Sequence, residues 1–168
     1  VTDQQFVIVH NMLTAEDPGG TYPSAPLKLT PWEGTTAIEL LPGGEVRVET
    51  RAGDWWGAGL EVDADVGENL SRFKNGHMHL EIRGSSDVNF SFGFQTGSFL
   101  RGDQVNNFAS FGPGTDNLVG EAWRTVTLPI PELDGGTDLS DVTNVVAFLS
   151  RAKAPNRTLY LRNIYFSQ

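Results

Sequence analysis

Residues 77–96 read HMHLEIRGSSDVNFSFGFQT and contain two segments in which apolar and polar residues alternate. Met78, Leu80 and Ile82 occupy every second position of the first segment, and phenylalanine occupies every second position of 90–94. Successive side chains of a β-strand point to opposite faces of the sheet. The alternation therefore predicts two strands whose apolar faces line a core and whose polar faces point outward.

The polar positions of these two strands carry short or planar groups in place of the long flexible side chains that are common on an exposed sheet. They are imidazole, carboxylate, guanidinium, hydroxyl and amide groups, with a glycine between them. Such groups fix the direction of a hydrogen bond, which suits sugar hydroxyls, and glycine lets a ligand approach the backbone. We therefore predict a ligand-binding face that includes His79, Glu81, Arg83, Ser91 and Gln95.

The stretch GDWWGAGLE, residues 53–61, places two tryptophans side by side among glycines. In a strand, one indole enters the core and the other points outward. Trp56 shares its register with the apolar residues that follow, so we expect it in the core. Trp55 shares its register with two glycines and Glu61, and we predict that it is a stacking platform for a sugar ring beside Glu61. If the register of the strand is shifted by one residue, Trp56 is the stacking platform. The non-functional alternative is that both tryptophans are buried.

The rest of the chain reads as short strands between glycine- and proline-rich turns, and no convincing long amphipathic helix is present. We predict an all-β fold of about nine strands, an antiparallel β-sandwich or jelly roll. The predicted strands span residues 5–11, 35–41, 45–50, 55–63, 77–83, 88–96, 123–130, 144–150 and 158–166.

Two predicted connections, residues 12–33 and 97–121, are long enough to carry function or only to cover the ends of the sandwich. Trp32 in the first connection is equally consistent with a stacking platform for a ligand and with a residue that packs the loop. Trp123 is expected to pack at the edge of the sandwich.

Length and charge restrict the function classes. The chain has 168 residues, which predicts a single domain over 1–168, and it has no cysteine. A formal net charge of -9 argues against nucleic acid and against strongly anionic ligands. No apolar run approaches the ~20 residues of a membrane helix. An uncharged partner is therefore expected, with no nucleic acid and no membrane.

Catalytic and metal motifs are mostly missing. Glu61 and Glu81 could serve as the carboxylate pair of a glycosidase, but neither a nucleophile elbow nor a phosphate loop is present. His77 and His79 lack a third metal ligand at suitable spacing. Calcium is a hypothesis for residues 15–20 and for the group Asp63, Asp65 and Glu68, although a solvated acidic turn is the simpler explanation of each taken alone. The tripeptide RGD at 101–103 arises readily by chance.

The order of the motifs resembles a known family. WGAGLEVD, NLSRFKNGHMHLEIRG, NFSFGFQTG, EAWRTVTLPIPEL, DLSDVTNVVAFLS and TLYLRNIYFSQ follow one another over residues 55–168. This order is similar to that of the galactose-binding-like, jelly-roll carbohydrate-binding modules of bacterial β-glucan-degrading enzymes. Family eleven modules and the C-terminal modules of marine exo-glucanases are examples.

The resemblance implies a non-catalytic module, tethered to a polysaccharide hydrolase, that binds a glycan on a concave sheet. The site would comprise Trp55, Glu61, His79, Glu81, Arg83, Ser91 and Gln95. Structural calcium is common in relatives, but this chain has Asn163 where many of them carry an aspartate in the final strand, so the metal ligands are unknown and no cofactor is required. The resemblance also implies a secreted or cell-surface bacterial protein, expected to be monomeric.

We therefore expect a carbohydrate-binding module for a neutral polysaccharide, a β-1,3- or mixed-linked β-glucan. Three alternatives stay open at this point. They are a small glycoside hydrolase or lyase that uses Glu61 and Glu81, a module for agarose or another algal glycan, and a structural sandwich such as an adhesin or spacer domain.

Overall fold

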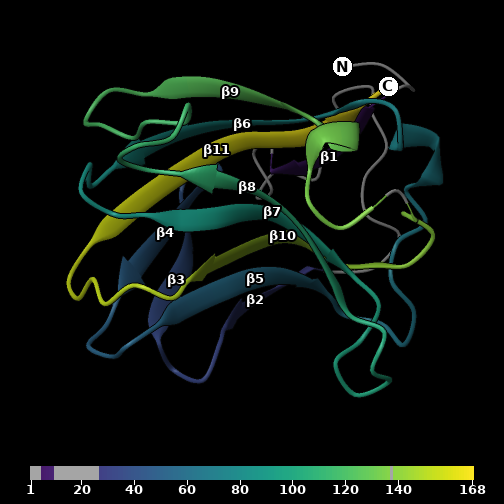
Figure 1. Cartoon of the computed structure of the whole chain (residues 1–168), viewed down its shortest axis with the longest axis horizontal. Helices are drawn as coiled ribbons and strands as arrows, with labels where there is room; N and C mark the ends of the chain where they lie inside the picture. Colours follow the sequence, from purple (N-terminus) through teal and green to yellow (C-terminus); the bar gives the residue numbers. More distant parts are fainter. Residues whose placement is uncertain (1–4, 10–26, 137) are drawn as a thin grey trace.

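The computed structural model describes residues 5–9, 27–136 and 138–168, and in them the chain forms a sandwich of two antiparallel β-sheets (Figure 1). This confirms the predicted all-β fold. The eleven strands of the described residues are β1 (Gln5–Val9), β2 (Leu27–Pro31), β3 (Thr36–Leu41), β4 (Glu45–Thr50), β5 (Trp56–Val62), β6 (His77–Gly84), β7 (Phe90–Thr96), β8 (Val105–Phe111), β9 (Arg124–Pro129), β10 (Val142–Ser150) and β11 (Thr158–Ser167). Two short 3₁₀ turns, η1 (Ser71–Phe73) and η2 (Ile130–Glu132), complete the regular structure, and no helix in these residues is long and apolar enough to cross a membrane.

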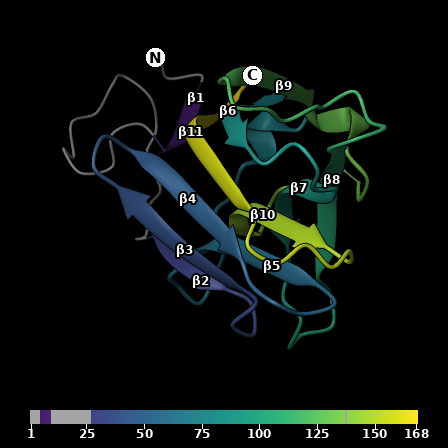
Figure 2. The same cartoon turned by 90° about the vertical axis from the view of Figure 1, so that its left-hand side faces the viewer.

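Each sheet joins strands that are distant in the sequence. The six-stranded sheet has the order β3-β4-β11-β6-β9, with β1 also paired to β11, and the five-stranded sheet has the order β2-β5-β10-β7-β8. Figure 2 shows β11 between β4 and β6, with β2 and β5 in the other layer. Successive strands lie in different layers except for the pairs β3–β4 and β7–β8, so most neighbours in the sequence belong to different sheets.

The core lies between the sheets and is built from the alternating apolar positions. Met78, Leu80 and Ile82 of β6 are at most 1% exposed, as are Phe92 of β7 and Phe148 of β10. Burial of these side chains is the main favourable term of folding, at roughly 25 cal/mol per Å² of apolar surface removed from water. The alternation of β6 and β7 therefore predicted the core correctly.

The hairpin between β3 and β4 also follows from the sequence. Pro42-Gly43-Gly44 forms the turn, and both glycines have positive φ angles, 90° and 83°. Glycine adopts this region without steric cost, so the turn brings the two strands into register, with Leu41 opposite Glu45.

The sequence pattern missed two strands, because each lies inside a segment that was predicted to be a long loop. β2 has the sequence LKLTP and ends at a proline, and β8 has the sequence VNNFASF, with two adjacent asparagines. Both are edge strands of the five-stranded sheet. Proline and asparagine are depleted in strands, but an edge strand needs ladder hydrogen bonds on one side only and tolerates them.

Candidate functional site

The predicted ligand face is divided between the two sheets, so the expectation of one common surface was wrong. His79, Glu81 and Arg83 lie on β6 and point outward from the six-stranded sheet. Ser91 and Gln95 lie on the outer face of the five-stranded sheet, on β7. Glu61 on β5 shares that second face, because it pairs with Asn144 of β10, which pairs in turn with Gln95.

The reason for the division is geometric. The chain passes from one layer to the other between β6 and β7, so the apolar sides of both strands face the same core and their polar sides face opposite exteriors. Glu61 and Glu81 are therefore on opposite sides of the sandwich. They cannot flank one glycosidic bond, which requires carboxylates less than about 10 Å apart. This geometry excludes Glu61 and Glu81 as the catalytic carboxylate pair of a glycosidase.

The outer face of the six-stranded sheet is braced by contacts among its own side chains. The guanidinium carbon of Arg83 lies 4.2 Å from the ring centroid of Tyr160 and 5.1 Å from that of Trp123. Arg162 lies 4.0 Å from the Trp123 centroid. These are cation–π distances. Trp123 is half-buried just before β9, and the expectation that it packs at an edge of the sandwich is confirmed.

The other polar groups of this face also have partners within the protein. Glu81 accepts hydrogen bonds from Asn163 and from Arg162, the latter at 3.3 Å. His79 Nε2 lies 2.7 Å from the Ser167 hydroxyl oxygen, and the ring stacks on Tyr165 with centroids 4.3 Å apart. Burial, and secondarily the charge of His77, lower the pKa of His79 below its usual value. These contacts hold the side chains of this face to one another, which indicates a structural role for them.

The outer face of the five-stranded sheet has a different organisation, in three rows that run across the strands. Cross-strand partners define each row, and we name the rows for their contents. The tryptophan row consists of Trp32, which follows β2, and of Gly57, Leu149, Ser91 and Ser110. The glycine row consists of Thr30, Gly59, Ala147, Gly93 and Phe108. The amide row consists of Lys28, Glu61, Asn144, Gln95 and Asn106.

Trp32 supplies the indole of this face. Its backbone N–H donates to the carbonyl of Gly57 at 3.1 Å, and its half-buried indole lies against Gly57. A Cβ atom at Gly57 would lie only 2.5 Å from Cε3 of the indole, so the ring can occupy this position only because residue 57 is a glycine. The structure therefore places an indole beside the bare glycines of β5, as expected, but the ring comes from another segment.

The two tryptophans of the WW pair do not supply that ring. Trp56 is 1% exposed and packs in the core, so it cannot be the alternative platform. Trp55 is half-buried and lies immediately before β5. A sequence signal for Trp32 was present, because Lys28, Thr30 and Trp32 alternate and share one face of a strand. The proline at position 31 concealed it.

Gln95 connects the amide row. It is 4% exposed, and its Nε2 donates to Asn106 Oδ1 at 2.8 Å. Its Oε1 accepts from Asn144 Nδ2 at 3.0 Å and from Gln104 Nε2 at 3.4 Å. These bonds leave a donor on Asn106 and an acceptor on Asn144 for other partners. At the end of the row, Glu61 accepts from the Thr30 hydroxyl at 3.2 Å.

A cavity of about 480 Å³ opens at the other end of this face. Leu149 and the serines at 91 and 110 line it, together with Arg151 in the loop after β10. Its remaining lining residues are Asn89, Phe90, Phe111, Thr115, Ser150 and Ala152. The cavity combines hydroxyl groups with apolar surface, as sites for uncharged polar molecules do.

No metal centre emerges from the described part of the chain. Its residues form no group of three or more histidine, aspartate or glutamate side chains that could hold an ion. Asp63 and Asp65 are exposed, whereas Glu68 is buried. Residues 15–20, the other calcium hypothesis, lie outside the described residues, so that hypothesis stays a prediction.

Comparisons with known proteins agree on the class of this protein. The sequence model of the family described as Carbohydrate binding domain 30 matches residues 3–168. No curated protein matches the chain significantly.

Among solved structures, a family 30 carbohydrate-binding module aligns with a TM-score of 0.64 and 19% identity, over 87% of this chain and 95% of that one. The family 30 module of a cellulosomal cellulase of Clostridium thermocellum aligns with a TM-score of 0.63 and 19% identity, over 98% and 91%. A family 11 module from the same organism, in complex with a β-1,3-1,4-mixed-linked tetrasaccharide, aligns with a TM-score of 0.64 and 13% identity, over 97% and 95%.

These similarities confirm the resemblance to jelly-roll carbohydrate-binding modules, including those of family eleven. They also confirm that the protein is not an enzyme, because such modules are non-catalytic. The family match spans 3–168 and therefore includes both sheets of the sandwich. The chain belongs to the family of carbohydrate binding domain 30 and is a non-catalytic carbohydrate-binding module.

Proposed function

We propose that the module binds a neutral β-glucan, β-1,3- or mixed-linked, on the outer face of the five-stranded sheet. The observation that carries the proposal is the position of Trp32, whose indole lies against Gly57 in the same row as three residues that line the cavity. The mixed-linked tetrasaccharide bound by the family 11 relative supports a β-glucan as ligand.

Stacking on Trp32 supplies the apolar part of the affinity. The equatorial hydroxyls of a β-glucosyl unit leave its ring faces rich in C–H groups, which pack well on an indole. Five strands about 4.8 Å apart give the face a width of about 19 Å across the strands, so several sugar units fit along the rows. A chain that crosses the strands diagonally contacts Trp32 at one edge of the sheet and the amide row toward the other edge.

Hydrogen bonds from the amide row supply direction. Gln95 holds the neighbouring asparagines in fixed orientations before the ligand arrives, so little conformational entropy is lost on binding. Agarose or another algal glycan is the second candidate, because its hydroxyls could use the same amides, and it belongs in the same binding panel.

We further propose that the module is monomeric, that it is tethered to a polysaccharide hydrolase, and that it works in a secreted or cell-surface bacterial protein. Two of the similar solved structures are modules of cellulosomal cellulases, which supports the tethering. A tethered module raises the local concentration of its enzyme at the polysaccharide.

The test is calorimetric titration of mixed-linked glucan, laminarin, cellulose oligomers, xylan and agarose oligomers into the wild type and into Trp32→Ala. We expect Trp32→Ala to weaken β-glucan binding at least tenfold, or by about 1.4 kcal/mol, because the stacking ring is lost. Trp123→Ala, on the opposite face, is the matched control and should leave the affinity unchanged.

Trp55→Ala tests the position predicted from the sequence. If Trp55→Ala or Trp123→Ala removes binding and Trp32→Ala does not, the assignment to this face is wrong. Binding of xylan or agarose in place of the glucans would overturn the proposed ligand.

A further inference from the structure

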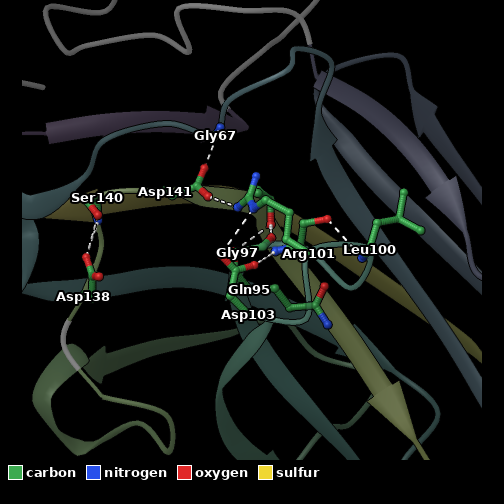
Figure 3. A network of polar contacts seen from close by, with 11 residues as sticks. Gly67, Gln95, Gly97, Leu100, Arg101, Asp103, Asp138, Ser140 and Asp141 are labelled. Atoms are coloured by element: carbon green, nitrogen blue, oxygen red, sulfur yellow. Dashed lines mark hydrogen bonds and ion pairs between the residues drawn. The ribbon is translucent and has the colours of Figure 1, made fainter.

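Exposed apolar side chains gather at one end of the sandwich. Among the described residues, five large apolar side chains are highly exposed, and four of them are Val66 (67%), Phe99 (80%), Leu100 (95%) and Val105 (36%). The segments that carry them meet at one carboxylate. Asp141 Oδ1 accepts the N–H of Gly67 at 2.8 Å, and its Oδ2 pairs with Arg101 (Figure 3).

The loop between β7 and β8, residues 97–104, is held in one conformation by its own hydrogen bonds. Asp103 Oδ1 accepts the N–H of Ser98 at 2.7 Å, and the N–H of Asp103 donates to the Ser98 carbonyl at 3.2 Å. Gly97 and Gly102 have positive φ angles of 70° and 77°. The loop is also fixed to β10, because the Thr143 hydroxyl donates to the Gly97 carbonyl at 2.7 Å. Its tip therefore loses little conformational entropy on binding.

The charged side chains of the loop form ion pairs within the protein. Arg101 Nε lies 3.2 Å from Asp103 Oδ2, and the guanidinium also pairs with Asp141. The hydrogen bond from the Ser98 amide, with a smaller contribution from Arg101, holds the pKa of Asp103 below its usual value. The charged groups of the RGD tripeptide thus brace the loop through contacts within the protein. Figure 3 shows the Leu100 side chain directed away from this network.

The loop continues directly from the proposed binding face. Gln104 follows its last turn and donates to Gln95 Oε1 at 3.4 Å, and Asn106 of the amide row lies two residues further. A rigid tip with two exposed apolar side chains therefore lies beside the amide row. Two exposed side chains offer far less than the ~800 Å² that each partner contributes to a standard protein interface.

We propose that Phe99 and Leu100 form a second polysaccharide contact, which packs on a neighbouring chain of an insoluble β-glucan while the sheet face holds the first chain. This inference rests on the proposed function. The two apolar side chains match the C–H faces of packed sugar rings, and this contact needs no charge on the partner. It adds affinity only where glucan chains lie side by side, because the two contacts then act together.

The double variant Phe99→Ser, Leu100→Ser tests the proposal in two assays, depletion by an insoluble glucan and calorimetry with a soluble oligosaccharide. Both side chains are exposed, so folding should be unaffected. We expect at least about fivefold weaker binding to the insoluble glucan and less than about twofold change with the oligosaccharide. Leu118→Ser, which removes an apolar side chain that is 55% exposed on another loop, is the matched control.

Unchanged binding to the insoluble glucan, or an equal loss in both assays, would overturn the proposal. So would sedimentation showing that wild-type oligomers dissociate in the double variant, since the tip would then contact a second copy of the chain. Trp32→Ala, measured in parallel, separates this result from the proposed function. If that variant binds the oligosaccharide normally, the sheet-face assignment fails, whatever the loop variant does.

Discussion

Gln95 shows how far sequence reasoning reaches at the scale of one residue. The alternation in β7 placed Gln95 on an outward face and suggested that it contacts the ligand. It does lie on that face, but it is 4% exposed and its amide is occupied by Asn106, Asn144 and Gln104. Alternation predicts on which side of the sheet a residue lies. It does not predict the hydrogen-bond partners of that residue, because they lie on strands that are distant in the sequence. Gln95 is therefore a positioning residue in the proposed site.

Replacing Gln95 with glutamate should weaken glucan binding about tenfold while the fold is retained. A carboxylate only accepts hydrogen bonds, so the variant no longer donates a hydrogen bond to Asn106 Oδ1. Asn106 must then turn its own N–H groups toward residue 95, away from the ligand. Calorimetry with a soluble oligosaccharide measures the loss, and urea unfolding measures stability. Gln104→Glu, at the periphery of the same network, is the control and should change affinity by less than about twofold. Equal affinities of wild type and Gln95→Glu would show that the asparagines need no positioning.

At the scale of the strand, the sequence predicted nine elements, and all of them correspond to strands, whereas the partition between the layers was missed. The outer face on which the polar side chains of a strand lie depends on the sheet to which that strand belongs. Alternation carries no information on which sheet that is. This is why His79, Glu81 and Arg83 were grouped with Ser91 and Gln95. The final strand adds a second irregularity, because the pairing of β11 with β6 shifts between Arg162 and Tyr165.

Asn163 lies at that shift and has a φ angle of 49°. Glycine, and to a lesser extent asparagine, tolerates this left-handed conformation, whereas β-branched residues do not. We expect Asn163→Val to lower the free energy of unfolding by about 1–3 kcal/mol. Asn163→Gly, the matched variant, loses the same hydrogen bond to Glu81 without the strain and should cost less. Urea unfolding compares the stabilities of the two variants. If Asn163→Val is more stable than Asn163→Gly, backbone strain at this position is ruled out.

At the scale of the whole molecule, charge distinguishes the proposed ligand from others. The net charge of -9 repels polyanions, but an uncharged glucan experiences no such force. Composition alone therefore supported the exclusion of nucleic acid as a partner, although it said nothing about where a sugar would lie.

Affinity for a neutral glucan should therefore change by less than about twofold between ~0.01 M and ~1 M salt, although the Debye length falls from ~30 Å to ~3 Å. Calorimetry with one oligosaccharide across this range measures it. A sulfated or uronic acid polysaccharide is the control, and we expect no binding at the lower salt concentration. An affinity for the neutral glucan that falls steeply with salt would indicate a charged ligand in its place.

The braced face of the six-stranded sheet, opposite the proposed site, makes the module suitable for oriented attachment. Thr125 on β9 is exposed on that face, opposite Glu81, and the chain contains no cysteine. A Thr125→Cys variant would carry a single thiol for a dye, a bead or a sensor surface. The whole thickness of the sandwich would then separate the label from Trp32, so immobilised molecules would all present the same side to the solution.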